Sequence, residues 1–210
     1  LVEVRGLTVR APGGKTLVDG ISFEIAPGEI LGLVGESGSG KSMTAMSLAR
    51  LQADGVAVDA EVLRLDDLDL LAGGHRSRLA KEIGLVYQDP GSTFNPALRM
   101  GAQLTEVARV HLGLSRRAAR DTLRDGLGEM RIREPEKVMG QHPFQLSGGM
   151  LQRAGIASSL VTDPKLLIAD EPTTALDVTV QADVLRQLRR LNRDHGTAVL
   201  FISHDIGVRS

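Results

Sequence analysis

The sequence predicts an α/β fold in which a parallel-sheet core carries an antiparallel β subdomain at its N-terminal end and a helical insert. Three observations support this prediction. Short, almost wholly apolar runs recur between helical stretches, at residues 31–34, 83–86, 166–169 and 198–202. Residues 1–25 instead alternate apolar and polar positions, and strand signals vanish between residues 95 and 134. Strands that alternate with helices are typical of a parallel sheet.

The first 25 residues are expected to form antiparallel strands. Apolar and polar residues alternate over 1–9 and 21–25, and the segment Ala11-Pro12-Gly13-Gly14 between them is rich in turn formers. The run at 31–34 has almost no polar position. We therefore expect this run to be a strand covered on both faces of the parallel sheet.

Two amphipathic helices are predicted in the insert, over residues 100–111 and 115–130, with Ser115 as the N-cap of the second. A later helix follows from the spacing of its apolar residues, which share one face. We expect Asp177 to cap this helix and Gly196 to end it.

Composition limits the classes of function. Lys and Arg number 25 against 26 Asp and Glu, a net charge of −1, so the chain has no broad basic field for nucleic acid. The absence of Cys excludes disulfides, thiolate metal sites and Cys nucleophiles, and fits a reducing compartment. No apolar run approaches about 18 residues, and no export signal is visible. The chain begins with Leu1 and stops soon after a strand, so we expect a segment of a longer polypeptide.

A glycine-rich loop follows the first apolar strand and matches G-x-x-x-x-G-K-[ST]. Its glycines let backbone N–H groups turn inward toward phosphate oxygens, and the helix after it offers a positive N-terminus. We expect Lys41 to reach the β- and γ-phosphates and the Ser42 hydroxyl to ligate Mg²⁺. A chance glycine-rich turn is disfavoured because strand and helix flank the loop. Its members are Gly35, Glu36, Ser37, Gly38, Ser39, Gly40, Lys41 and Ser42.

An acidic pair ends the apolar run at 166–169. Asp170 is placed to hold Mg²⁺ directly or through water, and Glu171 to polarise the attacking water as a general base. The alternative is a solvated acidic pair in a loop ended by Pro172. The phosphate loop upstream favours the catalytic interpretation.

Residues 146–150 read Leu-Ser-Gly-Gly-Met and resemble the signature motif of ABC ATPases. Ser147, Gly148 and Gly149 open a helix, so the chain has a second helix N-terminus able to approach an anion. The resemblance implies head-to-tail dimerisation, in which the signature of one subunit closes over the γ-phosphate held by the other. An ordinary serine cap and turn is the alternative for this segment alone.

Further matches to the family follow in the expected order along essentially the whole chain. Gln88 resembles the Q-loop glutamine, which contacts Mg²⁺ or the attacking water. The segment Ala175-Leu176-Asp177 resembles the D-loop at the dimer seam, and His204 resembles the switch histidine that bonds the γ-phosphate. A glutamine or histidine at a strand end is by itself usually a solvated loop residue. Their order and spacing favour the family assignment.

Residues 87–96 and 166–182 are similar to the ATP-binding subunits of dipeptide and oligopeptide importers, a branch that includes nickel importers. This implies an ATP- and Mg²⁺-dependent ATPase at the cytoplasmic face of the membrane. Its implied partners are a second ABC ATPase domain, transmembrane permeases docked near residues 89–96, and indirectly a solute-binding protein. The second ATPase domain could be identical, a paralogue or fused. The alternatives are an ABC ATPase acting on DNA or the ribosome, and a non-catalytic regulatory half.

The resemblance also implies boundaries and one departure. We expect a single, C-terminally incomplete ABC ATPase domain, with a catalytic core at 1–88 and 146–210 and a Q-loop and helical signature subdomain at 89–145. Most relatives stack adenine on an aromatic residue where this chain reads Thr8-Val9-Arg10-Ala11-Pro12. Phe23 fits the core better than an adenine platform. Arg10 could lay its guanidinium on the base, or be an exposed strand-end arginine.

Overall fold

The computed structural model describes residues 1–173 and 178–204. An antiparallel sheet occupies the N-terminal part, with strand order β2-β1-β5-β6 and β4 paired to β1. Its strands are β1 (Val2–Arg10), β2 (Thr16–Ile25), β4 (Ala57–Asp59), β5 (Val62–Leu65) and β6 (Leu68–Asp69). The predicted antiparallel subdomain is therefore confirmed. β2 begins at Thr16, before the predicted residue 21, and Val18 pairs with Val9. The register of the β1–β2 pairing shifts at several points, so the apolar and polar residues do not alternate regularly and the start of β2 could not be predicted from alternation.

The parallel sheet contains β3 (Ile30–Val34), β7 (Ile83–Val86), β8 (Leu166–Asp170) and β9 (Ala198–Ser203) in the order β3-β9-β8-β7. The predicted parallel core is confirmed. The expectation that β3 is covered on both faces is wrong for the described residues. β3 is the last strand in the sheet order, and Ile30 and Gly32, which lie on the same face of the strand, are both exposed, Ile30 at 43%. β9, a central strand, is buried at all its positions.

The helices follow the predicted pattern in the insert. α4 spans the predicted range, and the Ser115 hydroxyl accepts a hydrogen bond from the Ala118 N–H at 3.2 Å to cap α5. Gly196 ends α8 with a φ of 70°, whereas the predicted cap Asp177 lies outside the described residues. The helices are α1 (Lys41–Ala49), α2 (Arg76–Glu82), α3 (Pro90–Thr93), α4 (Met100–His111), α5 (Arg116–Glu129), α6 (Pro135–Gly140), α7 (Gly148–Leu160) and α8 (Val178–His195), with a 3₁₀ turn, η1, at Pro143–Gln145.

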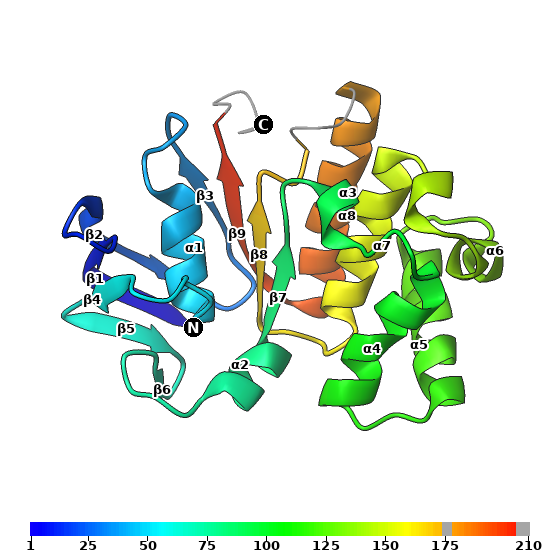
Figure 1. Ribbon diagram of the computed structural model, residues 1–210, viewed down its shortest axis with the longest axis horizontal. Helices are drawn as coiled ribbons and strands as arrows, with labels where there is room; N and C mark the ends of the chain where they lie inside the picture. Colours follow the sequence, from blue (N-terminus) through cyan, green and yellow to red (C-terminus); the bar gives the residue numbers. More distant parts are fainter. Residues whose placement is uncertain (174–177, 205–210) are drawn as a thin grey trace.

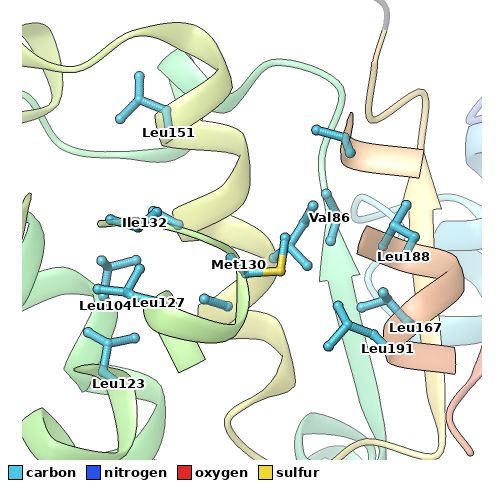
Figure 2. Close-up of a cluster of buried hydrophobic side chains, with 14 of the residues drawn as sticks. Val86, Leu104, Leu123, Leu127, Met130, Ile132, Leu151, Leu167, Leu188 and Leu191 are labelled. Atoms are coloured by element: carbon cyan, nitrogen blue, oxygen red, sulfur yellow. The ribbon is translucent and has the colours of Figure 1, made fainter. Parts of the chain in front are cut away.

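Two hydrophobic clusters meet at the parallel sheet. Leu167 and Ala169 of β8 pack with the helices of the insert and α8, whereas Leu166 and Ile168 pack toward α1 and the antiparallel sheet. Successive strand residues point to opposite faces, so a strand with a core on each side must be apolar throughout. Figure 2 shows Met130 between the leucines of the insert and those of the sheet and α8.

The carboxyl ends of the four parallel strands lie along one edge, at the top of Figure 1. α7 runs down from this edge: near its end, the Ser159 hydroxyl donates to the Leu85 carbonyl of β7 at 2.6 Å, and the chain then enters β8 at the bottom. The N-terminus of α7 therefore lies toward the same edge as the phosphate loop. Across residues 1–173 and 178–204, no helix is long and apolar enough to cross a bilayer.

Candidate functional site

The loop between β3 and α1 has the backbone that its glycines permit. Gly38 and Gly40 have φ values of 81° and 91°, in the left-handed region that side chains disfavour. A Cβ on Gly40 would lie 2.4 Å from the Leu17 carbonyl oxygen of β2. Glycine is therefore required at position 40 for both conformation and space.

The N-terminus of α1 is free to bind an anion. Its N-cap residue is Gly40, and no side chain caps the helix. The first N–H groups of a helix have no partner within it, and their dipoles favour negative charge. This end of α1 is thus suited to phosphate oxygens.

Lys41 is already directed into the loop. Its Nζ donates hydrogen bonds to the carbonyls of Gly35 at 2.8 Å and Glu36 at 2.7 Å, and the residue is only 7% exposed. A buried ammonium needs acceptors, and these carbonyls supply them. A phosphate group in the loop would offer stronger, charge-assisted bonds to the same ammonium.

Asp170 lies at the end of β8, opposite the first turn of α1. The pKa of its carboxyl is raised above its ordinary value, chiefly because the group is buried and also because of the nearby charge of Glu171. A hydrogen bond from Ser42 and the charge of Lys41 act in the opposite direction but do not cancel the increase. One oxygen, Oδ1, is buried without a hydrogen-bond partner. An unsatisfied carboxylate oxygen beside a serine hydroxyl is the oxygen-only donor set that Mg²⁺ prefers, so these residues fit the ion.

No cluster of three or more His, Asp or Glu side chains fit to hold a metal occurs in the described part of the chain. Mg²⁺ usually takes one or two protein ligands and completes its shell with waters and substrate phosphates. The Ser42 and Asp170 pair is consistent with that mode of binding.

Glu171, Gln88 and His204 meet at the ends of three neighbouring strands. Glu171 Oε2 accepts a hydrogen bond from Gln88 Nε2 at 3.0 Å and lies 3.1 Å from His204 Nδ1. Glu171 has a φ of 45°, and its N–H donates to the Ile202 carbonyl at 3.0 Å. This backbone bond ties the end of β8 to β9 and holds the unusual conformation. The structure thus brings together the three residues predicted to be catalytic.

The signature segment forms a helix start, as predicted. The Ser147 hydroxyl accepts a hydrogen bond from the Met150 N–H at 3.3 Å, and Ser147 and Gly148 are exposed. Gly149 is buried, and a Cβ there would lie 2.6 Å from Cγ1 of Val180 in α8. Gly149 was predicted to bind phosphate, and its contact with α8 was not predicted because Val180 is distant along the chain. The predicted D-loop residues, 175–177, lie outside the described residues.

A groove of about 730 Å³ opens between the parallel sheet and the helical insert. Pro90, Phe94 and Asn95 line it, in agreement with the predicted position of residues 89–96. Two further lining residues were missed. Arg50 Nη1 and Gln152 Nε2 are buried without a hydrogen-bond partner. Arg50 is the C-cap of α1 and Gln152 lies in α7, and no sequence pattern at either position predicted a groove.

The region predicted for adenine contains no aromatic side chain. Arg10 ends β1, pairs in the sheet with Thr16 and Ala57, and is exposed. Phe23 packs against the hydrophobic cluster around β1, as expected of a core residue.

Comparison with known proteins agrees with this geometry. Residues 18–174 match the family described as "ABC transporter". The chain is 47% identical over its whole length to a "Probable D,D-dipeptide transport ATP-binding protein" of Escherichia coli, covering 66% of that protein. It is 42% identical to an oligopeptide transport ATP-binding protein of Salmonella typhimurium, over 99% of this chain and 64% of that protein. The chain thus spans about two thirds of the length of these relatives.

Solved structures have the same fold. The dimeric, post-hydrolysis structure of the ATP-binding cassette MJ0796, bound to ADP and Pi, superposes with a TM-score of 0.78 at 27% identity, covering 99% of this chain and 90% of that one. A cbiO1 structure from Clostridium perfringens gives a TM-score of 0.84 at 23% identity, covering 99% of this chain and 80% of that one. The second similarity concerns the fold alone.

Proposed function

This chain belongs to the ABC transporter family, and from that premise we propose that it is the ATP-binding and ATP-hydrolysing subunit of an importer for di- or oligopeptides. The observation that carries the proposal is the position of Glu171. The Glu171 carboxylate, which contacts Gln88 and His204, lies at the carboxyl ends of the parallel strands. The uncapped N-terminus of α1 and the Lys41 ammonium lie at the same end of the sheet. A base beside a phosphate site is what triphosphate hydrolysis requires.

The nucleotide would be held chiefly by its phosphates. Residues 35–42 would surround the β- and γ-phosphates with N–H groups, and Lys41 would exchange its bonds to Gly35 and Glu36 for phosphate oxygens. Ser42, Asp170 and the amide oxygen of Gln88 would hold Mg²⁺, which when bound neutralises charge on the phosphates. Occupying the ion site would also satisfy the unpartnered Asp170 oxygen.

Glu171 would orient and deprotonate the attacking water. Its Oε2 accepts a hydrogen bond from Gln88 and lies within reach of His204. When Gln88 turns its amide oxygen toward the ion and His204 turns toward the γ-phosphate, Glu171 becomes available to water. The contacts that Gln88 and His204 make with Glu171 would thus link binding of the nucleotide to the availability of the general base.

Ser147 would serve a nucleotide held by a second ABC ATPase domain. Its hydroxyl already caps α7, and the exposed start of that helix is free to approach an anion. Mixing tests this: a Ser147→Arg chain paired with a Lys41→Ala chain retains one composite site built from intact halves and lacks both halves of the other. Turnover no higher than in either mutant alone, together with wild-type ATP crosslinking in Ser147→Arg, would show obligate coupling of the two sites. Weak crosslinking would count against the trans assignment.

Transmembrane permeases would dock in the groove between the sheet and the insert. It presents Leu98 with 48% exposure, beside the groove residues Pro90 and Phe94. An apolar surface of this kind suits a short helix that carries apolar residues. The chain would then act as a peripheral subunit at the cytoplasmic face of the membrane, and reach a solute-binding protein only through the permeases.

The peptide-import proposal is tested in cells. In a strain lacking the gene, the wild-type protein should restore uptake of a labelled dipeptide, and Glu171→Gln should not. Leu98→Glu should reduce co-purification with the permeases but leave ATP binding unchanged, whereas Val110→Glu, at a position 65% exposed in the insert, should affect neither. Normal dipeptide uptake without this protein would exclude the proposed role.

A further inference from the structure

Phe144 is the most exposed large hydrophobic side chain in the described part of the protein, at 74%. The chain has four Phe, one Tyr and no Trp, and Phe94 and Phe201 lie in the core. An aromatic ring left in water loses the burial that stabilises most phenylalanines. A single exposed ring needs no explanation by itself, but the surroundings of this ring are unusual.

The Phe144 ring is held in place. It stacks on the His142 ring with centroids 5.5 Å apart and an interplanar angle of 15°. The turn η1 beneath it is closed by two hydrogen bonds, from the His142 N–H to Gln145 Oε1 at 2.8 Å and from the Gln145 N–H to the His142 carbonyl at 3.0 Å. Pro143 between them is buried. A flat ring on a closed turn loses little conformational entropy when it binds another ring.

The ring stands beside the signature serine. Phe144 precedes Ser147 by three residues, which span about 10–11 Å at most. Both residues are exposed, while Leu146 between them packs against the hydrophobic core. A nucleotide whose γ-phosphate lies at Ser147 would extend its base over a comparable distance. Phe144 is therefore within reach of that base.

The chain that holds the phosphates has no ring of its own for the base. Its β1 end carries Arg10, Ala11 and Pro12 in the place of an aromatic, and Phe23 packs against the core. Bases stack on aromatic side chains because each presents an apolar π-face. If the nucleotide were held through its phosphates alone, a π-face of its base would remain in water. The Phe144 ring of the partner would remain in water as well.

We propose that Phe144 stacks on the base of the nucleotide held by a second copy of this chain, so that base recognition is supplied in trans. The inference rests on the proposed function, specifically on closure of the Ser147 segment over the partner's γ-phosphate. It deepens that function by naming a binding residue for the base. His142 is a positioning residue, because it backs the ring on the face away from the base.

A single-tryptophan reporter tests the contact. Phe144→Trp in a Glu171→Gln protein places the only tryptophan of the sequence at this position. Mg²⁺ and ATP should change its emission as the dimer forms, and inorganic tripolyphosphate, which has no base, should not. Val110→Trp in the same background is the matched control, since Val110 is 65% exposed and also apolar. Sedimentation of the same samples reports dimerisation independently.

Each outcome is decisive. Emission that changes for Phe144→Trp and not for Val110→Trp supports the proposal. A dimer that forms with no emission change at Phe144→Trp overturns the proposal and leaves the proposed function standing. Absence of a dimer at saturating Mg²⁺ and ATP overturns the trans contact along with the closure on which it rests.

Mixed dimers distinguish trans from cis recognition. A Phe144→Ala chain paired with a Lys41→Ala chain binds its nucleotide opposite an intact Phe144, so half-maximal dimerisation should need the same ATP concentration as a wild-type and Lys41→Ala pair. A wild-type chain paired with Lys41→Ala/Phe144→Ala binds opposite alanine and should need at least about fivefold more ATP. The reverse pattern, or no difference, would overturn the proposal. Phe144→Tyr on the second chain should restore wild-type behaviour, because it keeps the ring.

Discussion

Gln88 donates a hydrogen bond to Glu171 from a position 83 residues away, with Nε2 3.0 Å from Oε2. The amide therefore engages the same oxygen that also lies 3.1 Å from His204 Nδ1. The two residues that engage this oxygen are therefore the same two that are proposed to contact the ion and the γ-phosphate.

Glu171→Gln should keep the shape of the site and lose the base. We expect nucleotide binding to persist, the closed dimer to accumulate, and hydrolysis to fall by on the order of 10²–10⁴. Phosphate release measures the rate, and sedimentation with ATP and Mg²⁺ measures the dimer. Hydrolysis at the wild-type rate would remove Glu171 from its role.

Lys41→Ala should abolish hydrolysis and weaken nucleotide binding. A charge-assisted contact to phosphate contributes roughly 1.5–3 kcal/mol, which corresponds to a loss of about 10- to 150-fold in affinity. Titration calorimetry with ATP checks this value. Lys137→Ala, which removes an exposed lysine paired with Glu134, is the control and should bind normally. An unchanged affinity in Lys41→Ala would refute the phosphate-loop assignment.

Asp170→Asn should stabilise the nucleotide-free protein at neutral pH. Burial raises the pKa of the Asp170 carboxyl above its ordinary value of 3.8. Between the ordinary and the raised pKa the native state binds more protons than the unfolded chain, so the free energy of unfolding falls as pH rises through that interval. The asparagine variant has no carboxyl to ionise at this position, so its free energy of unfolding should not fall in this way. The difference in the free energy of unfolding between the variant and wild type should therefore be largest at pH 7 and shrink as pH falls.

Urea unfolding of Asp170→Asn and wild type between pH 7 and pH 5 tests this sign. The same variant should lose the extra stability that Mg²⁺ adds to the ATP-bound protein, since the carboxylate is a proposed ligand. A variant less stable than wild type at pH 7 without nucleotide would contradict the desolvation argument. A wild-type response to Mg²⁺ would remove Asp170 from the ion site.

Gly149→Ala should destabilise the crossing of α7 and α8. The new Cβ would lie 2.6 Å from Val180 Cγ1, and overpacking of this kind costs typically 1–3 kcal/mol. Val180→Ala should restore much of the loss in a double-mutant cycle. Gly128→Ala in α5, where nothing lies within 4 Å, is the control and should be neutral or stabilising. Equal effects of the two glycine substitutions would rule out the close contact.

Ala11→Tyr should tighten ATP binding by up to about 1 kcal/mol, because it adds a ring at the end of β1. In the wild-type protein we expect GTP to compete with ATP within about tenfold, since phosphate contacts supply most of the affinity and stacking discriminates purines poorly. Competition binding to the monomer measures both. Strong rejection of GTP, with no response to Ala11→Tyr, would mean that groups elsewhere read the base.

Features that depend on neighbouring residues were predicted correctly from the sequence. The phosphate loop is contiguous, and its glycines permit the left-handed backbone that the structure shows at Gly38 and Gly40. The same is true of α4, whose apolar spacing predicted its range, and of the Ser115 and Ser147 caps, where a side chain bonds an N–H three residues on. Glu171 was predicted from its position after an apolar strand downstream of the phosphate loop, and Gln88 and His204 were predicted from their resemblance to a family.

Only the tertiary structure brought Gln88 and His204 to one carboxylate oxygen of Glu171, because the distances between these side chains depend on the strand order β3-β9-β8-β7, which no local pattern encodes. The order of the strands also made β3 an edge strand, although its sequence is as apolar as that of the buried strands. Gly149 acquired its packing role from Val180 for the same reason. Residues close together in the sequence determine helix caps and loops. The packing of the two hydrophobic clusters determines which distant strand ends and helix faces come into contact.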